Sequence, residues 1–284
     1  MTAKNVQKEL RVFASAERKK AVEWFFKTGK GQYGEGDIFL GVSSPDMRRV
    51  SRKYRDLPFA ELQTLIASPI HEERSCALSI LVQRYEKGGE RQAQHKDPLP
   101  KASPSAAASN YASDEGERAD RAVPADPGQR RAIMDFYMRN RQYVNNWDLV
   151  DCSAHKILGR AIHEGLQEVE ILDRLAVSDI LWERRIAIIA TMYFIHKGQL
   201  EHTFRLAERL LADREDLMHK AVGWMLREAW KKDSAAVETF LIKHYSQIPR
   251  TALRYAIEKM EESKRLYFLK GRFLNCENWL AKRL

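Results

Sequence analysis

The apolar residues of this 284-residue chain recur at helical spacing along almost its whole length. In the stretches 175–190 and 206–226, for example, large aliphatic side chains return every three or four residues. That spacing places them on one face of a helix, whereas a half-buried strand would alternate apolar and polar side chains. We find no convincing alternating segment. The sequence therefore predicts an all-α fold of roughly ten or more helices joined by short turns.

A weak internal repeat runs through these predicted helices. Five segments begin with a basic residue that is followed by small and apolar residues, at Arg74, Lys156, Arg185, Lys220 and Arg254. The last four of these positions are separated by 29, 35 and 34 residues, a period typical of solenoids built from helix pairs. If each segment is the inner helix of its pair, the cations line one concave face and could follow a phosphate backbone. The alternative is that five loose matches arise by chance in a long helical protein.

The composition changes sharply between residues 88 and 130. This segment contains five of the nine prolines, a single aromatic residue and almost no large aliphatic residues. It cannot bury enough apolar surface to offset the entropy lost on ordering. We therefore predict a flexible insert at residues 89–130. The flanking parts, 1–88 and 131–284, are expected to form one continuous helical domain.

The charge balance indicates an acidic partner. The chain carries 48 Lys and Arg against 39 Asp and Glu, a formal net charge of +9. Nucleic acid is the first expectation for such a chain, and an anionic membrane surface is the second. Because acidic residues slightly outnumber basic ones in the predicted insert, the positive excess belongs to the helical parts.

The cysteines and the length of the apolar runs indicate the cellular location. Cys76, Cys152 and Cys276 are widely separated and odd in number, so neither a disulfide framework nor a CxxC site is indicated. The longest uncharged apolar run, residues 186–195, is about half of a bilayer span, and the N-terminus lacks the apolar core of a signal peptide. We therefore expect a cytoplasmic protein, nucleoid-associated if bacterial, without membrane insertion. A monomer is the simplest expectation.

The motifs of several large enzyme classes are missing from the sequence. Its eight histidines show no HxxxH or HxH spacing, so no metal site is predicted. The phosphate-binding motif GxxxxGKS/T does not occur, and no GxSxG elbow marks a nucleophilic serine. We therefore expect neither a metal nor a cofactor.

The segment VNNWDLVDCS, residues 144–153, is the most informative for function. With Asn146 as the N-cap, Trp147 and Asp151 lie four residues apart on one face of the first helical turns. A carboxylate near the positive end of the helix dipole should stay ionised and face the same space as the indole. The alternative is structural: the acidic residues favour a helix N-terminus, and Trp147 packs against the neighbouring helix.

Two further segments place tryptophan on helices. Trp182 and Arg185 stand at i and i+3, and Trp224 follows Gly223 inside a predicted helix. A glycine there costs roughly 1 kcal/mol relative to alanine, so it usually allows another group to approach the backbone closely. The alternatives are a core tryptophan with a small neighbour, and an arginine that is solvated or paired with a carboxylate.

Together these segments resemble a known family. NNWDLVD, LWERRIAI and HKAVGWMLRE, with FLGVSSPDMRR near the N-terminus, are similar to the AlkD-like DNA alkylation repair enzymes, which are DNA glycosylases. The similarity covers nearly the whole chain except the insert, where relatives have a short connection. It implies a curved right-handed solenoid of HEAT-like antiparallel helix pairs with a concave basic face.

The resemblance also implies roles for individual residues. The catalytic aspartate of the family falls on Asp151, its lesion-contacting tryptophans on Trp147 and Trp224, and its phosphate-binding arginine on Arg185. Tyr33 matches a further aromatic residue of the cleft. Additional contacts to the DNA backbone are expected from Arg48, Arg49, Lys156, Lys220 and Arg254.

The resulting hypothesis is a monofunctional glycosylase that excises positively charged N3- and N7-alkylpurines from duplex DNA. An alkylated purine leaves as a neutral base, so a single carboxylate that stabilises the oxocarbenium-like sugar and positions water can suffice. No lysine stands out as the nucleophile that a lyase would need. The alternative is a non-catalytic helical scaffold that binds nucleic acid or an acidic protein. The enzyme requires Trp147, Trp224 and Asp151 to meet in an open, basic hollow, whereas the scaffold can bury the indoles.

Overall fold

The computed structural model describes residues 1–87 and 126–271, and every regular element in these ranges is a helix. One isolated bridge joins Ile38 and Ile70. The all-α prediction is therefore confirmed. The α-helices are α1 (Ala3–Val12), α2 (Ala16–Phe25), α3 (Ser44–Lys53), α4 (Phe59–Ile66), α5 (His71–Lys87), α6 (Pro127–Arg139), α7 (Trp147–Ala154), α8 (Arg160–His163), α9 (Glu170–Ala176), α10 (Leu181–His196), α11 (Glu201–Leu210), α12 (Asp216–Trp230), α13 (Ser234–Lys243), α14 (Arg250–Ala256) and α15 (Glu262–Leu269).

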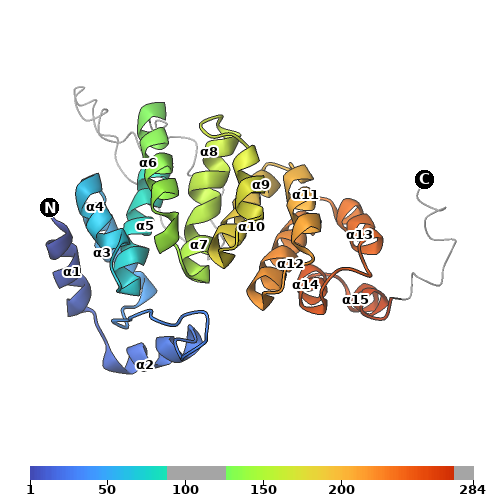
Figure 1. The fold of residues 1–284 in the computed structure, drawn as a ribbon, viewed down its shortest axis with the longest axis horizontal. Helices are drawn as coiled ribbons and strands as arrows, with labels where there is room; N and C mark the ends of the chain where they lie inside the picture. The colour runs from blue at the N-terminus through green and yellow to red at the C-terminus, as the bar shows by residue number, and fades with distance from the viewer. Residues whose placement is uncertain (88–125, 272–284) are drawn as a thin grey trace, which may run out of the picture.

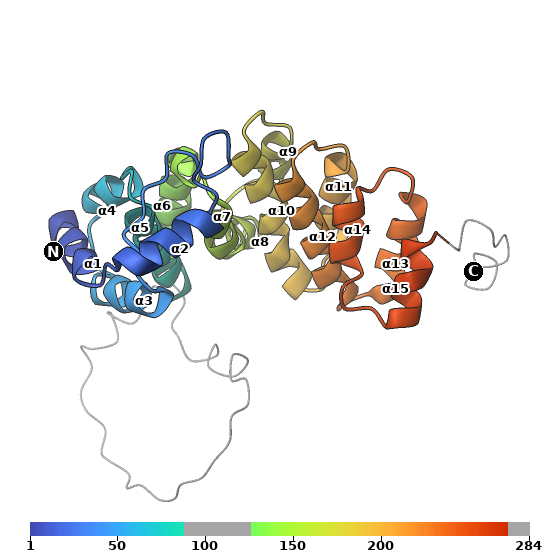
Figure 2. The same ribbon diagram turned by 90° about the horizontal axis from the view of Figure 1, so that it is seen from below.

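The helices follow one another along an arc from α1 to α15, and α2 lies apart from the row that the others form (Figure 1). Helices close in sequence pack together: α10 contacts α9, α11 and α12, and α12 contacts α14. Figure 2 shows the same succession from below, with α14 beside α12. The right-handed solenoid of HEAT-like pairs and its basic concave face stay predictions.

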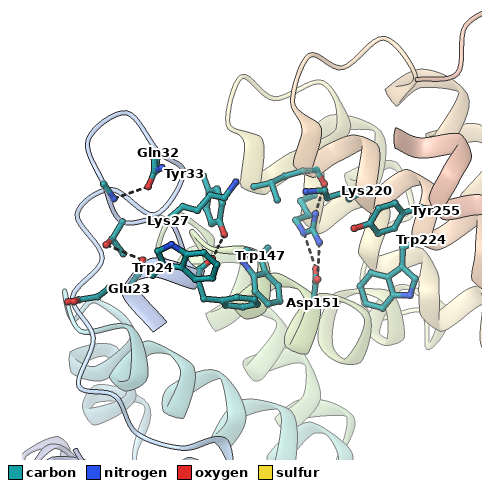
Figure 3. Close-up of a pocket in the computed structure, with 15 residues that line it drawn as sticks. Glu23, Trp24, Lys27, Gln32, Tyr33, Trp147, Asp151, Lys220, Trp224 and Tyr255 are labelled. Atoms are coloured by element: carbon teal, nitrogen blue, oxygen red, sulfur yellow. Dashed lines mark hydrogen bonds and ion pairs between the residues drawn. The ribbon is translucent and has the colours of Figure 1, made fainter. Parts of the chain in front are cut away.

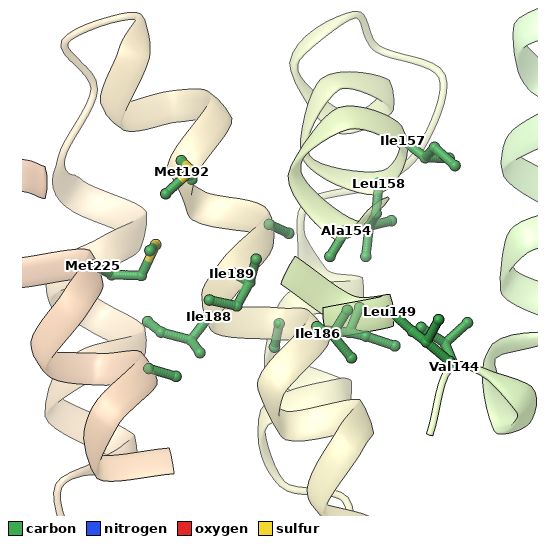
Figure 4. Packing of buried hydrophobic residues seen from close by; sticks show 14 of the residues in the cluster. Val144, Leu149, Ala154, Ile157, Leu158, Ile186, Ile188, Ile189, Met192 and Met225 are labelled. Carbon is green, nitrogen blue, oxygen red and sulfur yellow. The ribbon is translucent and has the colours of Figure 1, made fainter. Parts of the chain in front are cut away.

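Helix α10 forms the centre of the core because its sequence is apolar on nearly every side. Ile186 and Ile188 are fully buried. Figure 4 shows Ile186 on the side of Leu149 from α7, and Ile188 on the side of Met225 from α12. Since α7, α10 and α12 carry the residues singled out from the sequence, this shared core fixes their relative positions.

Two glycines allow helices to pack with unusually small separation. A Cβ atom at Gly159 would lie 2.1 Å from the carbonyl oxygen of Ala190 in α10. A Cβ atom at Gly223 would lie 2.4 Å from the carbonyl oxygen of Ala252 and 2.5 Å from Cβ of Tyr255, both in α14. These distances are below any van der Waals contact, so only glycine fits. The close approach predicted at Gly223 is thus confirmed.

Helix α7 begins where the sequence predicts. Asn146 is its N-cap, and the side-chain oxygen accepts a hydrogen bond of 2.8 Å from the backbone N–H of Trp147. The helix continues into a π-helical turn, His155–Gly159, and then into α8. Residues 147–163 therefore form one helical rod with a π turn in its middle.

Helix α2 contains no buried residue. At its N-terminal end the Ser15 backbone N–H donates to the carbonyl of Leu40 at 3.2 Å and the Arg18 guanidinium donates to the carbonyl of Gly41 at 2.8 Å, and at its C-terminal end Phe26 stacks on Phe39. Gly41 has a φ of +77°, and a Cβ there would lie 2.4 Å from the Ser15 carbonyl oxygen. The helix is thus anchored by backbone contacts and leaves most of its side chains in solvent.

Three sequence-based expectations touch the edges of the described ranges. The predicted insert, 89–130, lies largely outside them, but its last residues are helical because α6 begins at Pro127. Cys76 and Cys152 are free thiols, whereas Cys276 lies outside the described residues. Within residues 1–87 and 126–271, no helix has the length and apolar character needed to cross a bilayer.

Candidate functional site

A pocket of about 870 Å³ is lined by α2, the loop after it, α7, α10, α12 and α14 (Figure 3). The five residues that the sequence assigns to catalysis and substrate binding all line it. The full lining is Glu23, Trp24, Phe25, Lys27, Thr28, Gly29, Gln32, Tyr33, Trp147, Asp151, Arg185, Leu217, Lys220, Trp224 and Tyr255. The structure therefore brings together residues that are as far as 232 positions apart in the chain, from Glu23 to Tyr255.

Asp151 and Arg185 form a bidentate ion pair at the pocket floor. The Nε and Nη2 atoms of Arg185 donate to Oδ1 and Oδ2 of Asp151 at 2.9 and 2.8 Å, and Nη1 donates to the Leu217 carbonyl at 2.6 Å. Only 5% of the Arg185 side chain and 13% of the Asp151 side chain are exposed. The arginine is therefore paired internally, as the structural alternative proposed. Its predicted contact with a DNA phosphate stays a prediction.

Burial dominates the electrostatics of Asp151. Loss of hydration raises the pKa of its carboxyl group, the guanidinium of Arg185 opposes that shift, and the nearby Asp148 adds to it, so that the pKa lies above its ordinary value. Because both carboxylate oxygens accept hydrogen bonds from one guanidinium, the ionised form has a fixed orientation. The site thus holds a poorly hydrated carboxylate in the pocket.

Trp147 lies over an aromatic support. Its ring stacks on Phe26 at a centroid distance of 5.2 Å and an interplanar angle of 14°, and it meets Phe25 edge to face at 5.8 Å. The indole is half-buried and lines the pocket. It therefore both packs against a neighbour, as the structural alternative proposed, and presents surface to the cavity.

The opposite wall carries a second aromatic group. Trp224 of α12 is half-buried, and its Nε1 donates to Glu228 at 3.2 Å. Figure 3 shows Tyr255 of α14 close to Trp224. These two helices approach closely at Gly223, so the glycine sets the spacing of this wall.

Tyr33 belongs to the loop between α2 and α3. Its hydroxyl donates to the carbonyl of Phe25 at 3.3 Å, and its ring meets Trp182 of α10 edge to face at a centroid distance of 6.4 Å. The loop therefore reaches across to α10 and closes one side of the pocket. Trp182 itself is not among the lining residues.

A buried polar network behind α7 was not anticipated. His71 contacts Oδ2 of Asp148 through Nε2 at 2.8 Å, and its Nδ1 lies 3.5 Å from Asp37. Asp37 also accepts from Arg74 and, at 2.7 Å, from Asn146. Burial lowers the pKa of His71, but hydrogen bonds to Asp148 and Asp37 outweigh it and raise the pKa to about 9. A protonated His71 thus ties the start of α7 to α5 and to the loop after α2.

The residues predicted to contact the DNA backbone are distributed unevenly. Lys220 lines the pocket and pairs with Asp216 at 2.8 Å, whereas Arg48, Arg49, Lys156 and Arg254 are not among the lining residues. Arg48, Arg49 and Arg254 are exposed.

Two of the five cations that begin the repeated segments are engaged in buried ion pairs. Arg74 and Arg185 are both buried and are both paired with carboxylates, Asp37 and Asp151. Both charges are thus paired inside the protein, and a row of cations that follows a phosphate backbone stays a prediction.

Several pocket residues escaped the sequence analysis. Trp24, Phe25 and Lys27 come from the end of α2 and the residues after it, and Tyr255 comes from α14. The run Trp24-Phe25-Phe26 at the end of an otherwise polar helix is the signal that could have found the first two. Tyr255 carries no such signal, because its place depends on the contact between α12 and α14.

Comparison with known proteins identifies the family of this chain. The family model for DNA alkylation repair enzymes matches residues 6–260. A solved structure described as a predicted DNA alkylation repair enzyme from Enterococcus faecalis superposes with a TM-score of 0.58 at 15% sequence identity, covering 88% of this chain and 97% of the other. A comparison with curated proteins finds no match. The likeness in structure concerns the fold, but the family model spans nearly the whole chain, which therefore belongs to the family of DNA alkylation repair enzymes.

Proposed function

We propose that the protein is a monofunctional DNA glycosylase that releases N3- and N7-alkylated purines from duplex DNA. The single observation that carries the proposal is the meeting of Asp151, Trp147 and Trp224 in one pocket, with Arg185 bound to the carboxylate. Family membership supports a role in DNA alkylation repair and binding to DNA. The scaffold alternative is disfavoured because both indoles line the pocket and neither is fully buried.

The chemistry requires little more than one well-placed carboxylate. An alkyl group on N3 or N7 gives the purine a full positive charge, so the base departs as a neutral molecule and needs no proton from a general acid. As the C1′–N bond breaks, positive charge moves to the sugar. Asp151 stabilises that charge and orients the water that attacks C1′, and its limited hydration strengthens the interaction.

Arg185 acts in this proposal through Asp151. The bidentate contact holds both oxygens in place and keeps the carboxylate ionised against the effect of burial. Because Nη1 is bound to the Leu217 carbonyl, a phosphate contact would require the guanidinium to give up an existing partner. We assign the phosphate contact instead to the pocket lysines, Lys27 and Lys220.

The two indoles supply selectivity for the damaged base. A cationic purine against the face of Trp147 or Trp224 gains on the order of 0.5–2 kcal/mol from cation–π attraction for each face, which a neutral purine lacks. Phe26 already covers part of Trp147 by stacking and so supports the ring that receives the base.

The proposal excludes a lyase step at Lys220. Its hydrogen bond with Asp216 raises the pKa of the Lys220 ammonium group, so the amine stays protonated at neutral pH and is not a nucleophile. The expected product is an abasic site with an intact strand.

The test is release of 7-methylguanine and 3-methyladenine from a methylated duplex, measured by chromatography in the presence of a chelator. We expect release by the wild type and a rate at least about 100-fold lower for Asp151→Asn, with DNA binding retained. Asp213→Asn is the matched control, because Asp213 forms a similar ion pair with Arg184 outside the pocket. Equal release by Asp151→Asn and the wild type would remove Asp151 from the mechanism, and no release by the wild type would overturn the proposal.

A further inference from the structure

The end of helix α2 presents aromatic surface to solvent at the pocket mouth. Trp24 is 84% exposed and Phe25 is 55% exposed, although both line the pocket. A tryptophan side chain is seldom this exposed to solvent, and exposed aromatic residues beside a cavity are typical of binding sites. Figure 3 shows Trp24 on the same side of the pocket as Trp147, facing the wall that carries Trp224.

Helix α2 is also unusual in what supports it. None of its ten residues is buried, and an isolated helix shorter than about 12 residues is marginal in water. Its anchorage at Ser15 and Arg18 lies at the end distant from Trp24. At the aromatic end, Phe26 stacks on Phe39 and Trp147 and Phe25 meets Trp147 edge to face, whereas the neighbouring Trp24 stays largely in solvent.

The segment that carries this aromatic surface has an excess of positive charge, which favours an anionic occupant. Residues 16–31 hold two acidic side chains, Glu17 and Glu23, against five basic ones. The basic residues are Arg18, Lys19, Lys20, Lys27 and Lys30. Aromatic rings among cations are the combination with which proteins hold unpaired nucleotides, since the base stacks and the phosphate is neutralised.

Lys27 has a backbone conformation that favours glycine. Its φ is +52°, in the left-handed region, and it directly follows the end of α2, where glycine commonly terminates a helix. A lysine at this position keeps a cation on the pocket lining in spite of the conformational cost. The strained backbone at Lys27, like the exposed indole of Trp24, is therefore consistent with a binding role at the pocket mouth.

From these observations we propose that Trp24 and Lys27 form a second DNA contact at the pocket mouth, opposite Asp151. Trp24 stacks on a nucleobase of the damaged strand that has lost its stacking partner, and Lys27 neutralises the adjoining phosphate. The inference rests on the proposed function for the identity of the strand. It adds residues that bind DNA, and it assigns them no part in bond cleavage.

The test compares Trp24→Ala, Trp24→Phe and the wild type, with Val177→Ala as the control. Val177 is 63% exposed and does not line the pocket. We expect Trp24→Ala to weaken binding to a duplex with one 7-methylguanine roughly tenfold, Trp24→Phe to recover most of that loss, and Val177→Ala to match the wild type. The rate of base release by Val177→Ala should stay within about twofold of the wild-type rate. Melting temperatures equal to that of the wild type will show that each variant is folded.

The outcomes separate the inference from the proposed function. If the wild type releases base but Trp24→Ala binds the duplex as tightly as the wild type, the inference is overturned and the proposed function stands. If the wild type releases no base but Trp24→Ala still weakens DNA binding, the proposed function fails and the DNA contact stands. If Trp24→Ala lowers binding to phosphatidylserine vesicles and leaves DNA binding unchanged, the surface belongs to a membrane and the inference is also overturned.

Discussion

Replacing Arg185 by methionine should remove the partner of a buried carboxylate and keep most of the side-chain volume. The change deletes two charge-assisted hydrogen bonds to Asp151 and one to the Leu217 carbonyl. Both side chains of the pair are almost inaccessible, so solvent screening does not reduce the effect. Breaking a buried pair in this way costs about 3–5 kcal/mol of unfolding free energy, a large part of the roughly 5–15 kcal/mol typical of a folded domain.

The loss of unfolding free energy in Arg185→Met should depend on pH, and the direction of this dependence follows from the pKa of Asp151. Burial already places the pKa of Asp151 above its ordinary value, and removing Arg185 removes the group that opposes this shift. The folded-state pKa then rises further above the unfolded value of about 3.9. Stability falls as the pH rises from about 4 toward the new folded-state pKa, because the unfolded chain releases the proton more readily. The destabilisation should therefore be largest at neutral pH and smaller at pH 5.

Urea unfolding of Arg185→Met and the wild type at pH 5 and pH 8 measures both effects. Arg184→Met is the control, because it removes an arginine from the buried Asp213 outside the pocket. It should lower stability while leaving the rate of base release unchanged, whereas Arg185→Met should lower both. A loss below about 1 kcal/mol, or an equal loss at both pH values, would refute the view that Arg185 holds Asp151 as a buried carboxylate.

Three further predictions follow from separate parts of the site. Gly223→Ala should lower stability by about 1–3 kcal/mol through overpacking of α12 on α14, and an unchanged melting temperature would contradict this packing. The pKa of His71, raised to about 9, contributes stability that is complete below about pH 6.5 and is lost as the pH rises through 9. Unfolding free energies should therefore fall by roughly 3 kcal/mol over that range in the wild type and stay nearly flat in His71→Gln; parallel profiles would refute the ion pairs. Lys220→Gln should reduce the slope of log Kd against log salt by about 0.9, whereas Lys231→Gln, outside the pocket, should not; equal slopes for Lys220→Gln and the wild type would exclude a phosphate contact.

Local sequence signals predicted a large part of the site. The placement of Trp147 and Asp151 on one face needs only helical spacing and the cap at Asn146, both of which lie within six residues. Gly223 likewise indicates a close contact between helices, because a glycine inside a helix lowers its stability and is kept where another group approaches the backbone. These features depend on neighbours in the chain, and so they can be read before the fold is known.

The remainder depends on contacts between distant segments. The partner of Asp151 is 34 residues away, and His71 meets Asp148 across 77 residues. Trp24 left no periodic signal, because α2 buries no residue and has no apolar face to recognise. Such pairings arise only when the helices are packed in three dimensions, and a spacing rule cannot supply them.

The π turn at His155–Gly159 lets one rod serve two different surfaces. A π turn contains one more residue than an α turn, so side chains beyond it are rotated by about 100° relative to a continuous α-helix. Asp151 before the turn faces the pocket, while Gly159 at its end meets the backbone of α10. Removing a single residue from this turn would swing one of these two surfaces out of phase with its partner. The number of residues in the π turn thus sets the angle between Asp151, which faces the pocket, and Gly159, which packs on α10.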